Sequence, residues 1–248
     1  MLAEEQLATG RRGARYQYTW AVLHAADVAR SLGIPRIAAL EFGCAGGNGL
    51  VALELAAELA EARLGVAVDV HGFDTAAGLP SPADHRDAPY LMQKGQFPMD
   101  EVRLRARLSR TRLHLGLVRE TIGGFADSPG PPVGFIAFDL DYYSSTIDAL
   151  MLFDAPAERF LPRVLCYFDD TLGYPWGDSN GERLAIHESN ERRAARVIDR
   201  LEGMRWLIPH SQFDARWTEA LYLAHILDHP RYADEEGTTL GTRLDLQN

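Results

Sequence analysis

Short apolar runs alternate with longer segments of helical periodicity along most of the chain. Five apolar runs are expected to form strands, at residues 37–42, 68–73, 113–118, 134–139 and 163–168. Between the first two runs, Val51, Leu55 and Leu59 recur at the spacing of one helix face. Strands that alternate with helices in this way predict an α/β fold with a parallel sheet.

Further elements are expected at both ends of this pattern. A helix at residues 15–32 is predicted within an N-terminal helical segment, residues 1–35. Near the other end, a helix at about residues 182–201 precedes two extended runs, 204–209 and 219–227. The link between these two runs is too short for a helical crossover, so we expect them to pair antiparallel.

No linker, repeat or low-complexity tract divides the chain, so we expect one domain over residues 1–248. Residues 79–98 are rich in proline and polar side chains and show no clear periodicity. Loops of this length in compact domains are usually functional, which makes this segment a candidate lid. The tail, residues 229–248, is polar and predicts no particular structure.

Composition and charge exclude several classes of protein. The chain has 35 acidic and 25 basic side chains and a net charge of −10, which disfavours nucleic acids and anionic membrane surfaces as partners. Cys44 and Cys166 lie in or beside apolar runs, as in a reduced cytosolic protein rather than a disulfide scaffold. No segment has the pattern of a secretory signal or a membrane span, so we expect a soluble, cytoplasmic protein.

A glycine-rich turn, residues 43–49, follows the first predicted strand and leads into a helix. This arrangement is typical of nucleotide-type sites, because glycine lets the backbone approach a ligand closely. Residues 47–52 fit the dinucleotide fingerprint G-x-G-x-x-A, which would indicate NAD(P). That fingerprint starts where a strand ends, whereas Gly47 lies five residues beyond Phe42.

A second pattern begins at the strand end itself. Glu41-x-Gly43-x-x-x-Gly47-x-Gly49 resembles the first motif of class I methyltransferases that use S-adenosylmethionine (SAM). The resemblance implies that Glu41, Gly43 and Gly47 lie at the methionine portion of SAM. It also implies that Asp74, at the end of the second predicted strand, hydrogen-bonds the ribose hydroxyls.

The same resemblance implies a Rossmann-like fold with a mostly parallel seven-stranded sheet, an antiparallel C-terminal strand pair and helices on both faces. Glu120 follows the third predicted strand with Arg119, where methyltransferases of this class often contact adenine. Homologues of this size are often homodimers.

Two pairs of acidic residues follow two central strands of the predicted sheet. Asp139 and Asp141 come after the fourth strand, and Asp169 and Asp170 come after the fifth. In a doubly wound sheet these strands are expected to be neighbours, about 4.8 Å apart, so the carboxylates should converge. Convergent carboxylates repel one another unless protons or a cation lie between them, and oxygen ligands favour Mg²⁺, Ca²⁺ or Mn²⁺. Each acid taken singly could instead cap a helix or a turn.

Four segments occur in the order seen in the macrocin O-methyltransferase family, which methylates sugar hydroxyls of macrolide antibiotics. They are GFDTAAGLP, KGQFPMDEV, FDLDYYSST and YFDDTLG. By this resemblance Asp139, Asp169 and Asp170 are Mg²⁺ ligands and Asp141 is an acid beside the metal. The arrangement is also similar to catechol O-methyltransferase, which chelates two acceptor oxygens on its ion. Thr171 departs from the family's usual tyrosine.

The expected reaction is in-line transfer of a methyl group from SAM to a hydroxyl of a small natural-product or sugar-like acceptor. Asp139 and Asp141 are the candidate catalytic residues, with Asp141 orienting the site or accepting the proton. Tyr174 and Trp176 are candidates for acceptor binding. Two alternatives stay open: an NAD(P)-dependent oxidoreductase, which gives no account of the four acids, and a non-catalytic SAM-binding protein.

Overall fold

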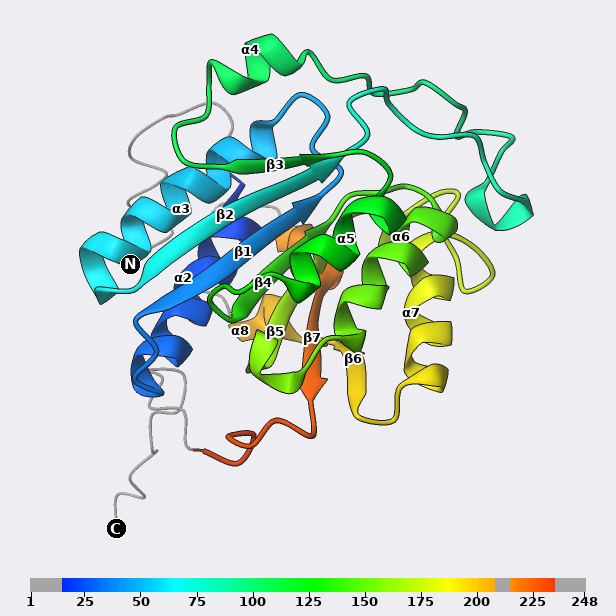
Figure 1. Cartoon of the computed structure of the whole chain (residues 1–248). Coiled ribbons are helices and arrows are strands. Elements are labelled where there is room, and N and C mark those ends of the chain that lie inside the picture. The colour runs from blue at the N-terminus through cyan, green and yellow to red at the C-terminus, as the bar shows by residue number, and fades with distance from the viewer. Residues whose placement is uncertain (1–14, 208–214, 235–248) are drawn as a thin grey trace.

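A seven-stranded sheet forms the centre of the computed structural model, which describes residues 15–207 and 215–234 (Figure 1). The strand order is β3-β2-β1-β4-β5-β7-β6. The strands are β1 (Arg36–Phe42), β2 (Ala67–Asp74), β3 (Arg112–Leu115), β4 (Val133–Phe138), β5 (Phe160–Phe168), β6 (Arg196–Arg200) and β7 (Leu221–Ile226). The pairs from β3 to β5 are parallel, and β7 runs antiparallel to both β5 and β6. The predicted Rossmann-like α/β fold is confirmed.

Helices cover both faces of this sheet (Figure 1). The α-helices of the described residues are α2 (Tyr16–Ser31), α3 (Asn48–Leu64), α4 (Glu101–Arg105), α5 (Val118–Asp127), α6 (Tyr143–Leu150), α7 (Gly181–Arg192) and α8 (Met204–Leu207). Helices α2 and α3 pack together on one face, and α5, α6 and α7 lie on the other. None of the helices within the described ranges has the length and apolar character that crossing a bilayer would need.

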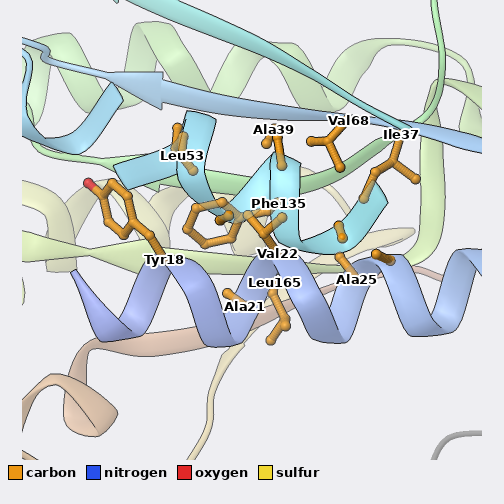
Figure 2. Packing of buried hydrophobic residues seen from close by; sticks show 14 of the residues in the cluster. Tyr18, Ala21, Val22, Ala25, Ile37, Ala39, Leu53, Val68, Phe135 and Leu165 are labelled. Atoms are coloured by element: carbon orange, nitrogen blue, oxygen red, sulfur yellow. The ribbon is translucent and has the colours of Figure 1, made fainter. Parts of the chain in front are cut away.

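The two faces of the sheet have separate apolar cores, because side chains alternate along each strand. Beneath α2, the side chains of Tyr18 and Val22 pack against Phe135 and Leu165 (Figure 2). Next to Phe135 in sequence, Ile136 belongs to the core on the opposite face. Since β4 is buried on both faces, its sequence is a continuous apolar run, which is typical of a central parallel strand.

The C-terminal part of the sheet differs from the prediction. The helix expected at 182–201 ends at Arg192, and Arg196–Arg200 form the edge strand β6. The side chain of Asn190 accepts from the N–H of Ile198 and donates to its carbonyl, which ties the end of α7 to this strand. Charged side chains are tolerated on β6 because it is an edge strand, so its sequence resembles an exposed helix face.

The predicted antiparallel pair is therefore formed by other partners. Strand β7 pairs with β5 and β6, not with the run at 204–209. That run begins as helix α8, and residues 208–209 lie outside the described residues. The strand expected at 113–118 was also too long, because β3 ends at Leu115. Most of the predicted polar tail and residues 1–14 of the N-terminal segment lie outside the described ranges.

Candidate functional site

A cavity of about 730 Å³ opens at the carboxyl ends of the parallel strands. The glycine-rich turn after β1, Asp74 at the end of β2 and the four acids after β4 and β5 all line it. The loop 79–98 lies on the side of the molecule toward which β1 and β2 point (Figure 1). Ligands of open α/β sheets bind at this edge, so the cavity is the candidate active site.

Asp74 holds the glycine-rich turn in place. Its Oδ2 accepts the backbone N–H groups of Cys44 at 2.8 Å and Ala45 at 2.9 Å. Its Oδ1 accepts the N–H of Ala76 at 2.7 Å. Asp74 lines the cavity, where a ribose-binding acid would have to lie, and it also fixes the backbone on which a cofactor would rest.

Two glycines of the turn are required by close packing. Gly43 has a φ of 82°, and a Cβ there would lie 1.8 Å from the backbone oxygen of Asp139. A Cβ on Gly49 would lie 1.6 Å from Oε1 of Glu41. Gly47, the N-cap of α3, has a left-handed conformation with a φ of 74°. The dinucleotide fingerprint starts directly at the end of a strand, whereas Gly47 lies five residues after Phe42, the last residue of β1.

Glu41 lies beneath the turn and is not among the residues that line the cavity. Its side chain is buried, and Oε1 accepts a hydrogen bond from the Tyr18 hydroxyl at 2.9 Å. Oε2 has no hydrogen-bond partner among the described residues. Burial raises the pKa of Glu41 to about 8, and the negative charge of Asp139 adds to this while Arg15 opposes it. The structure therefore gives Glu41 a supporting position rather than a direct place beside a ligand.

The four acids that follow β4 and β5 form one wall of the cavity. Strands β4 and β5 are neighbours, as predicted, and Phe138 pairs with Phe168 at their ends. The N–H of Asp141 donates to Oδ2 of Asp170 at 3.0 Å. Asp141 itself has a φ of 58°, so the chain turns sharply after β4.

The pKa values of these acids reflect their crowding. Burial raises the pKa of Asp139 to about 7, and the neighbouring Asp169 charge adds to the shift. Burial and the same neighbour raise the pKa of Asp141 to about 6. The pKa of Asp170 lies well above its usual range, first through burial and then through the charges of Asp141 and Asp139. A carboxyl whose pKa lies near neutrality can both hold and accept a proton.

The predicted metal ligands Asp139, Asp169 and Asp170 are brought together at this wall, and their hard carboxylate oxygens suit Mg²⁺. Each, however, already has a protein partner: Arg15 contacts Asp139, the Tyr167 hydroxyl donates to Asp169, and Asp141 donates to Asp170. In the described part of the chain, no three His, Cys, Asp or Glu side chains are arranged to hold a metal ion. The donor chemistry thus fits a divalent cation, whereas the side-chain positions do not form its coordination shell.

Arg15 also lines the cavity, although its sequence context does not predict this. It is the N-cap of α2, and its Nη1 lies 2.9 Å from the Tyr18 hydroxyl and 3.4 Å from Oδ2 of Asp139. The Tyr18 hydroxyl in turn donates to Glu41, so one network links α2 to β1 and β4. No motif marks an arginine that precedes an apolar helix, so only the tertiary structure reveals this contact.

The residues after β3 lie only partly in the cavity. Glu120 is exposed and is not among the residues that line the cavity, whereas Leu117, Val118 and Arg119 are. Helix α5 starts at Val118, and residues two positions apart on a helix do not share a face. Of the two residues predicted to lie near adenine, Arg119 therefore lines the cavity and Glu120 does not. Across from it, burial raises the pKa of Asp148, an effect that Arg119 opposes.

The candidate lid, residues 79–98, is anchored to the rest of the molecule at Asp87. This buried carboxylate accepts hydrogen bonds from the Ala83 N–H at 2.7 Å and from the N–H and hydroxyl of Ser144, each at 2.8 Å. The start of α6 is thus held by Asp87 and not by Asp141, which the sequence had suggested as a cap. Leu79, where the loop begins, lines the cavity, so this part of the segment belongs to the cavity wall.

Tyr174 and Trp176, the predicted acceptor-binding aromatics, are not among the cavity-lining residues. Tyr174 is 84% exposed, and the ring of Trp176 packs against Gly181 at the start of α7. Their assignment to the acceptor has no support from this geometry.

Comparison with known proteins identifies the fold. No protein-family model matches the sequence, and no curated protein matches it. The structure is similar to that of CalS11, a calicheamicin methyltransferase, with a TM-score of 0.56 and 21% identity over 85% of this chain and 80% of that chain. It is also similar to the O-methyltransferase NovP, with a TM-score of 0.54 and 16% identity over 74% of this chain and 75% of that chain. At such identities the similarity establishes a shared Rossmann-like fold.

Proposed function

We propose that this protein transfers the methyl group of SAM to a hydroxyl group of a small-molecule acceptor. The observation that carries the proposal is that a glycine-rich turn held by Asp74 and a wall of four carboxylates share one cavity. The sulfonium and ammonium groups of SAM are cationic, so they complement this acidic cavity. The fold shared with CalS11 and NovP, both methyltransferases, supports the same conclusion.

In this proposal one side of the cavity binds SAM and the other side binds the acceptor. The turn at Gly43 and Gly47 takes the methionine end of SAM, Asp74 takes the ribose, and the start of α5 at Val118 contacts the adenine. The acceptor hydroxyl lies on the acidic side, where Asp141 and its neighbour Asp139 can receive its proton. The new oxygen–carbon bond forms as the sulfur–carbon bond breaks, and S-adenosylhomocysteine leaves with the electron pair on sulfur.

We further propose that Asp139, Asp169 and Asp170 are the residues that would hold a divalent cation such as Mg²⁺. The support for this step is the set of hard carboxylate donors gathered at the ends of β4 and β5. When bound, such an ion would lower the proton affinity of a hydroxyl and fix its orientation. If turnover is unchanged after dialysis against EDTA, the carboxylates act without a metal.

Calorimetric titration of the purified protein tests the cofactor class. We expect S-adenosylhomocysteine to bind with micromolar affinity and NADH, titrated in parallel, not to bind. Binding of NADH alone would mean that the turn serves an oxidoreductase. Repeating both titrations with Mg²⁺ and with EDTA separates the metal proposal from the cofactor proposal.

A methyl-transfer assay then separates an enzyme from a protein that only binds SAM. CalS11 is a calicheamicin methyltransferase, so hydroxyl-bearing natural products and their sugars are the first acceptors to test. Transfer of labelled methyl groups from SAM to one of them would establish the activity. Tight cofactor binding without transfer to any hydroxyl compound would favour the non-catalytic alternative.

A further inference from the structure

Arg15 approaches the cavity from a rigid support. Its backbone begins α2, whose apolar face is buried against the sheet between Tyr18 and Ala29 (Figure 2). Its guanidinium lies beside Asp139, whose backbone oxygen is in turn packed against Gly43 of the glycine-rich turn. The arginine is therefore fixed at the end of the cavity where the proposed function places the methionine portion of SAM.

The charges that line the cavity are unequal. Among the described residues that line it, six carboxylates face two guanidiniums, those of Arg15 and Arg119. Arg119 lies in the first turn of α5 and near Asp148, on the side assigned to adenine. Arg15 is thus the cavity-lining cation on the side of the glycine-rich turn.

The hydrogen bonds of Arg15 leave part of its guanidinium available. Both of its contacts, to Tyr18 and to Asp139, are made through Nη1. Through Nη2 and Nε it makes no hydrogen bond to another residue in the described ranges. The contact with Asp139 is long, at 3.4 Å, whereas charge-assisted pairs are typically about 2.7–2.9 Å. A guanidinium with two free donors in a plane matches a carboxylate group.

We infer that Arg15 binds the carboxylate of the methionine moiety of SAM. This inference rests on the proposed function, since it assigns one residue to one group of the proposed cofactor. In SAM the methionine carboxylate is the anionic group, and every other charged group is cationic. The carboxylates that line the cavity repel that group and the guanidinium of Arg15 attracts it, so Arg15 makes the site selective for ligands with an intact amino-acid end.

The test compares two ligands that differ only in this carboxylate: S-adenosylhomocysteine and its decarboxylated form, 5′-(3-aminopropylthio)-5′-deoxyadenosine. Calorimetry of the full chain should give the intact ligand an affinity about 10- to 100-fold higher, as expected for hydrogen bonds to a charged group. In Arg15→Gln this preference should fall to about twofold or less. Arg15→Lys should retain part of it, because lysine keeps the charge but loses the planar fork.

Arg119→Gln is the matched control, since it removes the other cavity-lining guanidinium. It should leave the ratio of the two affinities unchanged, even if both affinities fall. The ratio is also insensitive to a general loss of stability, which matters because Arg15 contacts the buried network of Tyr18 and Glu41.

The outcomes separate the inference from the proposed function. If the unaltered protein binds both ligands equally, or if Arg15→Gln keeps the full preference, the inference is wrong while SAM binding stands. If neither ligand binds the unaltered protein, the proposed function itself fails.

Discussion

The two halves of the cavity are built from the same kind of side chain but differ in how its charge is satisfied. The turn half consists of the glycine-rich turn, residues 43–49, and Asp74. There, the carboxylate of Asp74 accepts hydrogen bonds from three backbone N–H groups and has a donor on each oxygen. In the acid half, four carboxylates share one wall, and the pKa values of Asp139 and Asp141 are raised to about 7 and about 6. The carboxylate of the turn half is hydrogen-bonded within the protein, whereas the acid half gathers negative charge that the protein alone does not neutralise.

This difference separates carboxylates that stabilise the fold from carboxylates that can take part in the reaction. A carboxylate with a backbone donor on each oxygen stabilises the fold and positions a backbone. Carboxylates brought together against their mutual repulsion stabilise little, so their arrangement makes sense when a ligand, a proton or a cation completes it. Substitutions in the two halves should therefore have opposite profiles, with structure and binding lost in one and turnover lost in the other.

The largest effect is expected from Asp141→Asn in the acid half. Asparagine tolerates the left-handed conformation of this residue, at a φ of 58°, so the turn after β4 should persist. The variant cannot accept the proton of the acceptor, and kcat should fall by about 10²–10⁴-fold. Affinity for S-adenosylhomocysteine, measured by calorimetry, should stay within about threefold.

Asp127→Asn, at the exposed end of α5, is the matched control and should be indistinguishable from the unaltered protein. If Asp141→Asn keeps its activity, the proton goes elsewhere and Asp141 only shapes the turn.

Asp74→Asn should affect the turn half in the opposite way. The amide nitrogen cannot accept a hydrogen bond, so at least one N–H from Cys44, Ala45 or Ala76 loses its acceptor. The cost is about 1–3 kcal/mol, enough to weaken cofactor binding by about 5- to 150-fold. Asp69→Asn on the same strand breaks only a surface pair with Arg36 and should leave affinity unchanged. Equal affinities in the two variants would contradict the role of Asp74.

Much of this comparison could be predicted from the sequence. The turn half is a local motif, because a strand, a glycine turn and a helix follow one another along the chain. The acid half was predictable because the acids follow two buried apolar runs, which are typical of adjacent central strands.

The contacts that could not be predicted join segments far apart in the chain. Arg15 reaches Asp139 across 124 positions, and Asp87 reaches Ser144 across 57. No periodicity or motif connects such pairs, since they depend on how α2 and the loop 79–98 pack. Strand β6 was missed for another reason: at the sheet edge its outer residues, Asp199 and Arg200, are exposed like those of a surface helix.

A smaller effect is expected where the loop 79–98 joins the acid half. Asp87→Asn replaces one of the two carboxylate oxygens that accept hydrogen bonds from Ala83 and Ser144. The loss should cost about 1–2 kcal/mol of local stability. The chain has one lysine, Lys94, and it lies exposed in this loop. A lysine-specific protease should therefore cut the variant there about tenfold faster than the unaltered protein. Asp100→Asn, at the N-cap of α4, preserves a capping side chain and should be cut at the original rate.

The smallest effect is expected at Glu54 on α3, outside both halves of the cavity. Its carboxylate accepts the N–H groups of Ser109, Arg110 and Thr111 and both hydroxyls of that segment. Burial acts to raise its pKa, but these hydrogen bonds outweigh it and lower the pKa below the usual value. In Glu54→Gln the amide oxygen can replace most of these contacts, so the loss should be about 1 kcal/mol near neutral pH.

The pH dependence of that loss has a definite sign. A carboxyl with a lowered folded-state pKa stabilises the protein above its unfolded pKa of about 4.3, and the contribution disappears as the pH falls through the folded value. Denaturation curves of the two proteins should thus differ at pH 7 and converge below about pH 4. Turnover and cofactor affinity should not change, because Glu54 touches neither half of the cavity. A difference in stability that persisted in acid would mean that Glu54 acts through packing and not through its charge. Glu54 could then no longer serve as the example of a hydrogen-bonded carboxylate against which the crowded acids of the cavity are compared.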